Sequence, residues 1–362
     1  MNQIFAERIF KKSGPPIHLI WFITARCNLC CSHCFYYRQI LNPAEELSFA
    51  EITKTVSRLS PLLSVSLTGG EPFLRDDLPE IAGLFSQKKL TRNIVLFTNG
   101  FDTNRILAAA EKIVSICKGI NIFIGVSIDG FQREHDQYRN KNGSYLNALN
   151  SVRELKKLKD CFRNLNLGIG ITLHKGNQQI IKELRADIYS KFGIHPGITL
   201  IRGEPQSPEL LEVEAGIYRK TISAIARDRS AAKPCGLLDA IMAAREILGQ
   251  KMAYKTFSRG SRSHDCFAGS LMGVIYENGD VYPCEMLKGY KSGNLRDSGY
   301  DLNKIWASAA ADAARKWIKL KKCHCTYECQ YTCNILYNIR FLPLLARGIL
   351  THKLFARRTI LW

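Results

Sequence analysis

The sequence of 362 residues carries 51 Lys and Arg against 32 Asp and Glu, a formal net charge of +19, and 46% of its residues are hydrophobic. This composition supports a large buried core, and no apolar stretch reaches the about 20 residues of a transmembrane helix. The charge favours an anionic partner, such as an acidic peptide, a phosphorylated small molecule or a membrane surface. Its spread along the chain, without a nucleic-acid-binding motif, argues against nucleic acid.

Residues 1–12 lack the apolar core of a signal peptide. The chain has 13 cysteines, and a thiol-rich protein without a secretory signal is expected in a reducing cytoplasm.

Strand-like and helix-like segments alternate along the first two hundred or so residues. Strands are expected at 17–24, 65–67, 93–97, 120–127, 165–173 and 197–201. Helices are expected at 48–59, 77–88, 103–118, 144–159 and 178–191. Ser48 and Glu51 have the spacing of a capping box at the start of the first of these helices. The alternation predicts an α/β fold, a partial (β/α)6 TIM-like barrel, with its reactive site at the carboxyl ends of the strands.

A cysteine loop follows the first expected strand. Cys27, Cys31 and Cys34 have the spacing C-x3-C-x2-C, with Cys30 between them. Three thiolates on one short loop can bind three irons of a [4Fe–4S] cluster and leave the fourth iron without a protein ligand. The alternative is zinc, because Cys31 and Cys34 also form a C-x2-C pair. The odd number of cysteines argues against disulfides.

A glycine turn follows the second expected strand. Its residues are Gly69, Gly70, Glu71 and Pro72. Paired glycines let the backbone approach a ligand closely, and a carboxylate beside them can accept hydrogen bonds from an ammonium group. The same four residues on their own are also typical of an ordinary turn.

The cysteine loop and the glycine turn together resemble the signatures of the radical S-adenosylmethionine (SAM) superfamily. The resemblance implies that Cys27, Cys31 and Cys34 hold the cluster and that its fourth iron chelates SAM, whereas Cys30 lies outside the ligand pattern. It further implies an external electron donor of the ferredoxin or flavodoxin type, and a 5′-deoxyadenosyl radical that removes hydrogen from a substrate. The SAM contacts that it implies are Gly69, Gly70, Glu71, Pro72, Asn99, Ser127, Asp129 and Arg139. The last four could equally be ordinary strand ends and helix caps.

A second group of cysteines lies late in the chain: Cys266, Cys284, Cys323, Cys325, Cys329 and Cys333. The segment before them, 209–254, is expected to form two helices with a break at Pro234 and Cys235. Between the first two late cysteines, an Asn278-Gly279 pair predicts a hairpin. This region resembles the SPASM domain, which carries auxiliary [4Fe–4S] clusters.

The late cysteines depart from the usual SPASM pattern. That pattern is C-x2-C-x5-C-x3-C with one further cysteine, whereas this chain has C-x1-C-x3-C-x3-C and no cysteine after Cys333. The resemblance implies one or two auxiliary clusters. It assigns Cys266, Cys284 and Cys333 to the first, and Cys323, Cys325 and Cys329 to a second that lacks a ligand. Cys235, His264 or His324 could supply that ligand, or the iron could be left for substrate, and zinc is again the alternative.

Glu285 directly follows Cys284. In sulfatase-maturing relatives, an acidic residue near this place is thought to take a proton from the substrate radical, so Glu285 is the candidate catalytic base. The alternative is a solvent-facing glutamate on the hairpin.

The tail, 334–362, combines apolar residues with basic side chains and has no Asp or Glu. Its basic side chains are Arg340, Arg347, Lys353, Arg357 and Arg358. This composition suits an anionic membrane surface or an acidic substrate. The alternative is a segment that packs on the barrel, and Pro343 and Gly348 are expected to interrupt a helix here.

The sequence therefore predicts a radical SAM enzyme that oxidises or cross-links a peptide or protein. The alternatives are a small-molecule substrate, such as a haem precursor, sugar or lipid-linked compound, and a zinc or electron-carrier protein without radical chemistry. The expected segments are an extension (1–16), the barrel (17–208), a helical connector (209–254), a small cysteine-rich SPASM-like domain (255–333) and the tail (334–362).

Overall fold

The computed structural model describes residues 14–231, 236–262, 264–320, 323 and 325–354. The chain divides into two compact units. The first, here called the barrel unit, comprises the residues up to Leu211 together with Ala268–Lys316. The second, the helical unit, comprises Glu212–Phe267 and the residues from Trp317 onward.

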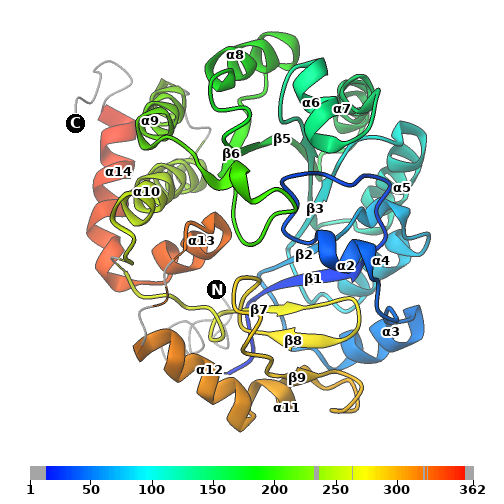
Figure 1. Ribbon diagram of the computed structural model, residues 1–362. Coiled ribbons are helices and arrows are strands. Elements are labelled where there is room, and N and C mark those ends of the chain that lie inside the picture. Colours follow the sequence, from blue (N-terminus) through cyan, green and yellow to red (C-terminus); the bar gives the residue numbers. More distant parts are fainter. Residues whose placement is uncertain (1–13, 232–235, 263, 321–322, 324, 355–362) are drawn as a thin grey trace. The chain divides into compact units, whose positions relative to one another are not determined.

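Parallel strands form the centre of the barrel unit (Figure 1). They are β1 (His18–Thr24), β2 (Ser64–Gly69), β3 (Asn93–Thr98), β4 (Asn121–Ser127), β5 (Leu165–Leu173) and β6 (Gly197–Leu200). These strands lie side by side in the order β6-β5-β4-β3-β2-β1. The predicted partial barrel is therefore confirmed.

Helices alternate with these strands, as the sequence predicted. The longer ones are α3 (Phe49–Arg58), α4 (Leu78–Gln87), α5 (Thr103–Ile116), α7 (Ser144–Cys161) and α8 (Ile181–Phe192). Shorter elements are α2 (Tyr37–Leu41), η1 (Pro72–Leu74), α6 (Gln132–Arg139) and η2 (Pro208–Leu211). Side chains from the sheet and the helices form the core between them. For example, Trp21 of β1 meets Phe85 of α4 edge to face, with 6.3 Å between ring centroids.

Helix α3 begins with the predicted capping box. The Ser48 hydroxyl accepts from the backbone N–H of Glu51, and the Glu51 carboxylate accepts from the backbone N–H of Ser48. The same carboxylate accepts from Arg296 Nε at 2.7 Å, which lowers the pKa of Glu51 to about 2. The start of α3 is therefore tied to a segment almost 250 residues later in the chain.

The late hairpin is part of the main sheet. Its strands are β7 (Met272–Ile275) and β8 (Asp280–Tyr282), and the short β9 (Gly293–Asn294) pairs with β8. The predicted Asn-Gly turn is confirmed, with Gly279 at φ 87°. Strand β7 pairs in parallel with β1, so the sheet has nine strands and continues as β1-β7-β8-β9. This pairing places residues 268–316 in the barrel unit, so the expected 255–333 segment is divided between the two units.

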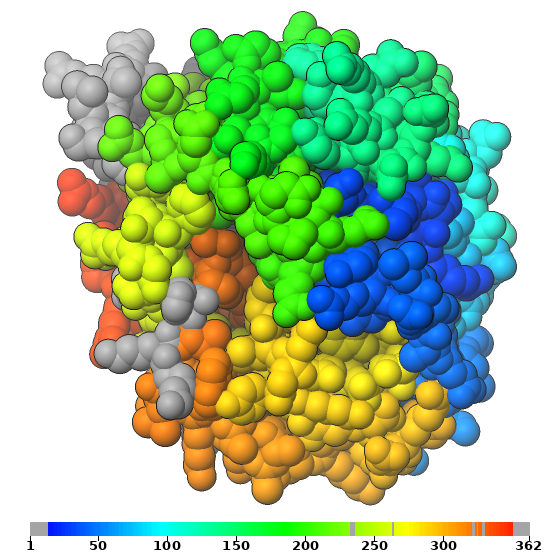
Figure 2. Space-filling model, viewed as in Figure 1, coloured from blue at the N-terminus to red at the C-terminus, as the bar shows by residue number. Residues whose placement is uncertain are grey.

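The strand ends carry loops that meet at the surface of the barrel unit. In Figure 2, the segment after β6 lies against the cysteine loop after β1. The Ser207 N–H donates to the Ser32 carbonyl at 2.8 Å, and Cys30 Sγ lies 3.6 Å from Gln206 Oε1. The loop after β6 therefore fixes one side of the cysteine loop.

Helices α11 (Leu302–Trp306) and α12 (Ala309–Leu320) follow β9.

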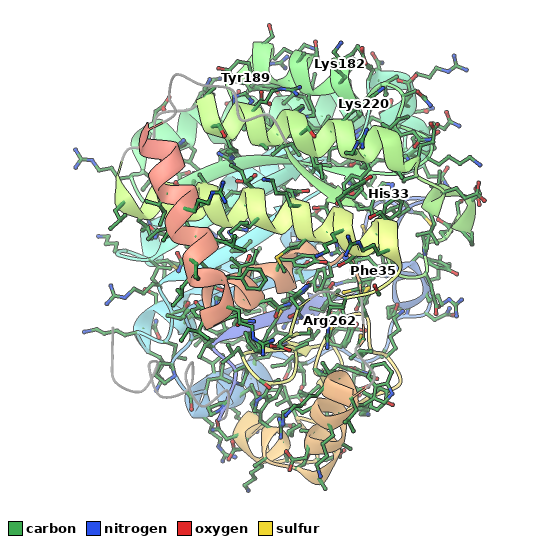
Figure 3. The ribbon with its side chains drawn as sticks, turned by 90° about the vertical axis from the view of Figure 1, so that its left-hand side faces the viewer. His33, Phe35, Lys182, Tyr189, Lys220 and Arg262 are labelled. Carbon is green, nitrogen blue, oxygen red and sulfur yellow. The ribbon has the colours of Figure 1, made fainter. Side chains whose placement is uncertain are left out.

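The helical unit contains the two predicted connector helices, α9 (Ala215–Ala231) and α10 (Leu237–Arg259). The expected break at Pro234 and Cys235 lies outside the described residues. Arg262, labelled in Figure 3, follows α10. The later helices are α13 (Glu328–Leu336), η3 (Ile339–Phe341) and α14 (Leu342–Leu354).

Helix α14 corrects one expectation. Neither Pro343 nor Gly348 interrupts it, because Pro343 lies in the first turn, where no backbone N–H is needed. A Cβ added to Gly348 would lie 2.9 Å from Ala244 Cβ, so the glycine allows α14 to approach α10 closely. Leu345 is buried in the core formed with α10. Arg357 and Arg358 lie outside the described residues, and no described helix is long and apolar enough to cross a bilayer.

Replacing Ser48 by Ala should lower the free energy of unfolding by about 1 kcal/mol, because the first turn of α3 loses a capping acceptor. Urea denaturation measures this change. The matched control is Ser57→Ala in the same helix, whose exposed hydroxyl only donates to the Lys54 carbonyl. Equal losses in the two variants would show that the capping box does not stabilise the barrel unit.

Candidate active site

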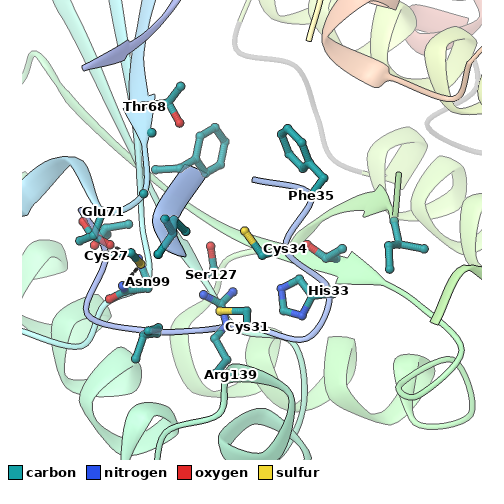
Figure 4. Close-up of a pocket in the computed structure, with 18 of the residues that line it drawn as sticks. Cys27, Cys31, His33, Cys34, Phe35, Thr68, Glu71, Asn99, Ser127 and Arg139 are labelled. Carbon is teal, nitrogen blue, oxygen red and sulfur yellow. Dashed lines mark hydrogen bonds between the residues drawn. The ribbon is translucent and has the colours of Figure 1, made fainter. Parts of the chain in front are cut away.

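A cavity opens at the carboxyl ends of the strands of the barrel unit (Figure 4). Its wall includes three cysteines of the loop after β1, the turn after β2 and the ends of the later strands. The predicted site residues in this wall are Cys27, Cys31, Cys34, Gly69, Gly70, Glu71, Asn99, Ser127 and Arg139. The structure thus brings together residues that the sequence had placed after four different strands.

The three cysteines are all partly buried, and all three line the same cavity. Burial raises the pKa of the Cys27 and Cys34 thiols to about 12, and it raises that of Cys31 as well. Such thiols are neutral without a cation and lose their protons when they bind a metal. Cys30, in contrast, is directed to Gln206 and does not line the cavity.

Glycine is required in the turn after β2 because that turn touches the start of the cysteine loop. Gly69 has φ +139°, and a Cβ there would lie 2.0 Å from the Thr24 carbonyl oxygen. A Cβ on Gly70 would lie 2.3 Å from the Arg26 carbonyl oxygen. The Gly70 N–H donates to Thr24 at 2.9 Å, and the Glu71 N–H donates to Arg26 at 2.8 Å.

Glu71 is 3% exposed, and burial raises the pKa of its carboxyl to about 7. One carboxylate oxygen accepts from the Asn99 N–H at 2.7 Å and the other from the Phe73 N–H at 3.2 Å. The Asn99 side chain donates to Asn28 Oδ1 at 2.8 Å, which joins β3 to the cysteine loop. Pro72 is buried at the start of η1 and does not line the cavity.

Asp129 lies behind the cavity wall rather than in it. It is fully buried, and its Oδ2 accepts from Arg139 Nε at 2.9 Å and Nη2 at 2.5 Å. Its Oδ1 accepts from the Thr172 N–H at 2.7 Å. Burial alone would raise the pKa of Asp129, but the Arg139 guanidinium holds it well below its usual range. Asp129 therefore positions Arg139, which does reach the cavity.

His33 and His174 extend this buried network, and neither was predicted from the sequence. His33 Nε2 lies 3.4 Å from Asp129 Oδ2, and its ring stacks on His174 with 5.4 Å between centroids. His33 lies between Cys31 and Cys34, so its place in the loop was a usable signal. His174 gave no such signal, because it only follows β5.

Glu285 is buried, so the interpretation of a solvent-facing glutamate is wrong. It is 4% exposed, and its Oε2 lies 3.5 Å from Arg202 Nη2. Arg202 lines the cavity, with its guanidinium 5.2 Å from the Phe35 ring centroid, and it was missed because an arginine after β6 belongs to no motif. The pair links the hairpin to the cavity.

The late cysteines are divided between the units. Cys284 is buried in the barrel unit, whereas Cys266, Cys323, Cys325 and Cys333 belong to the helical unit. Burial raises the pKa of Cys323, and the nearby Cys266 raises it further. The Cys329 side chain, Cys235 and His324 lie outside the described parts. Among the described residues, no three Cys, His, Asp or Glu side chains converge as they would around a single ion.

Two family models match the chain. The model of the radical SAM superfamily matches residues 21–211, and that of an iron–sulfur cluster-binding domain, SPASM, matches residues 266–334. The two matches cover the cavity wall and the late cysteines, respectively.

Curated relatives fall into two chemical groups. Pre-heme d1 synthase of Dinoroseobacter shibae is 34% identical over 49% of this chain and 41% of its own length. AdoMet-dependent heme synthase of Methanosarcina barkeri is 28% identical over 82% of this chain and 84% of its own length. Mycofactocin maturase MftC of Mycobacterium ulcerans is 26% identical over 81% of this chain and 75% of its own length. The chain spans about two fifths of the length of the first of these relatives.

Solved structures share the fold. The structure titled "Native anSMEcpe with bound AdoMet and Cp18Cys peptide" superposes with a TM-score of 0.59 at 16% identity, over 93% of this chain and 99% of that one.

Replacing Asp129 by Asn should cost about 3–5 kcal/mol in the free energy of unfolding, because it leaves the Arg139 guanidinium buried without its counter-charge. Urea denaturation provides the measurement. The matched control is Asp187→Asn, which breaks a partly exposed pair with Lys191 and should cost less than about 1 kcal/mol. A loss no larger than in the control would contradict a structural role for the buried pair.

Proposed function

The chain belongs to the radical SAM superfamily, and on this premise we propose that it is a maturase that oxidises or cross-links a peptide substrate. It is an enzyme with a SAM-binding [4Fe–4S] cluster, and its SPASM domain carries auxiliary iron–sulfur clusters. When bound, these groups supply one-electron cleavage of SAM to a 5′-deoxyadenosyl radical and further redox centres for the substrate. We propose a ferredoxin or flavodoxin type of protein as the external reductant.

The residues of the cavity fit the first cluster. Three partly buried thiols, Cys27, Cys31 and Cys34, face one cavity beside a turn that carries a buried carboxylate. The donor set is one thiolate short of a complete cubane, so one iron would have no cysteine ligand and could bind SAM. This combination is the observation that carries the proposal.

The remaining wall residues hold SAM in place in our proposal. Glu71 would accept a hydrogen bond from the SAM amino group, because its carboxylate is buried and fixed by two backbone N–H groups. Arg139, oriented by Asp129, attracts the SAM carboxylate. Asn99 and Ser127 offer further polar contacts, whereas Pro72 shapes the turn without reaching the cavity.

Glu285 is the proposed proton acceptor for the oxidised substrate. It is buried, it follows Cys284 directly, and it pairs with Arg202 at the cavity wall. A carboxylate beside the cavity wall can take up a proton as a general base. Arg202 in turn gives the cavity a cation for an acidic substrate group, which agrees with the net charge of +19.

The similarity to mycofactocin maturase MftC, over most of both chains, supports the role of a maturase. A second candidate is a tetrapyrrole, because AdoMet-dependent heme synthase is similar over an even larger share of its own length.

Replacing Cys31 by Ala should remove the iron of the first cluster, because the cluster then loses one of its three thiolate ligands. Replacing Cys30 by Ala should leave the iron content unchanged, because Cys30 does not line the cavity. Iron and sulfide analysis after anaerobic reconstitution measures both. Because both cysteines lie in the same loop, the Cys30→Ala protein is the matched control. Equal iron loss in the two variants would refute the ligand assignment.

The substrate class is tested by the stimulation of 5′-deoxyadenosine formation. We expect a synthetic library of acidic peptides to raise the rate and to yield peptides that have lost hydrogen by mass spectrometry. Glu285→Gln should keep basal SAM cleavage but lose this peptide product. Stimulation by iron coproporphyrin III and not by any peptide would favour the tetrapyrrole instead.

A further inference from the structure

We propose that His264 is an iron ligand of an auxiliary cluster, in a position that the late cysteines leave open. The inference rests on the iron–sulfur cluster-binding domain and not on the substrate class. Two complete cubanes need eight thiolates, whereas the chain has six late cysteines, at 266, 284, 323, 325, 329 and 333. At least one iron is therefore open to a ligand other than cysteine.

The chain around His264 is anchored next to these cysteines. On one side, Arg262 Nη2 donates to the Ile318 carbonyl at 3.2 Å, five residues before Cys323. On the other side, the Phe267 N–H donates to Asn334 Oδ1 at 2.9 Å, directly after Cys333. His264 lies between these two anchors, two residues before Cys266.

The His264 ring itself is held on α13. It packs on Tyr331 with 4.9 Å between ring centroids. The Tyr331 hydroxyl is placed in turn by the Cys325 carbonyl, at 3.0 Å, and by the Thr256 hydroxyl. The ring is therefore fixed by the same loop that carries the late cysteines, as expected for a preorganised ligand.

Buried polar atoms without partners lie on the segment that carries His264 and on α13, against which its ring packs. Among the described residues, the buried atoms His264 Nδ1 and Arg262 Nη1 have no hydrogen-bond partner. Neither do the two amide atoms of Gln330, whose side chain is 2% exposed. Buried polar groups are normally satisfied, so these unpaired atoms call for a partner.

An anionic cluster beside His264 would satisfy its imidazole and the Arg262 guanidinium. The imidazole nitrogen would bind iron, while the guanidinium would donate hydrogen bonds to cluster sulfurs. Imidazole is a known substitute for thiolate in iron–sulfur centres, where it raises the reduction potential. His264 therefore gives this auxiliary cluster a higher potential than an all-cysteine cluster.

The test uses a background in which Cys27, Cys31 and Cys34 are replaced by Ala, so that only auxiliary iron remains. The protein carries 15N-labelled histidine and is reconstituted with iron and sulfide, then reduced with dithionite. Pulsed electron paramagnetic resonance detects histidine nitrogen coupled to the cluster. The variants are His264→Ala, His264→Cys and His324→Ala, with His195→Ala, whose ring stacks on Tyr189 in the barrel unit, as the matched control.

We expect 15N coupling in the background, in His195→Ala and in His324→Ala. His264→Cys should retain iron and lose the coupling, and its reduction potential should fall. His264→Ala should lose the coupling together with part of the iron. The proposal is overturned if the background binds auxiliary iron without any histidine coupling, if the coupling survives in His264→Cys, or if His324→Ala abolishes it.

Discussion

Two backbone hydrogen bonds, from Gly70 to Thr24 and from Glu71 to Arg26, hold the glycine turn against the start of the cysteine loop. They form only because neither glycine has a Cβ, since a methyl group would lie within 2.3 Å of a carbonyl oxygen at either position. This contact places the buried carboxylate of Glu71 in the same cavity as three thiols. The position of Glu71 relative to the thiols therefore depends on this contact.

The sheet extends the same arrangement to the late part of the chain. Strand β7 pairs with β1, the strand that leads into the cysteine loop, so the hairpin delivers Cys284 and Glu285 to the barrel unit. The Arg202–Glu285 pair then joins the last parallel strand to the hairpin. Glu285, Arg202 and the cysteine loop each lie shortly after a strand of this one sheet, so the sheet fixes where their loops begin.

The sequence sufficed for features that depend on local pattern. Alternating segments predicted the parallel strands, and the spacing of Cys27, Cys31 and Cys34 predicted the cavity wall. Features that depend on long-range packing could not be predicted from the sequence. They are the pairing of β7 with β1, the burial of Asp129 behind Arg139, and the approach of Arg202 to Glu285. Helix α14 shows the same limit, because Pro343 and Gly348 are helix breakers by propensity, but the first turn accommodates one and contact with Ala244 requires the other.

The central claim is that this cavity binds SAM at an open iron and cleaves it. The most direct measurement is the formation of 5′-deoxyadenosine by anaerobically reconstituted protein in the presence of SAM and dithionite, quantified against a protein in which Cys27, Cys31 and Cys34 are all alanine. We expect 5′-deoxyadenosine from the parent protein and none from the triple variant. Equal amounts from both, or none from a parent protein with full iron content, would contradict it.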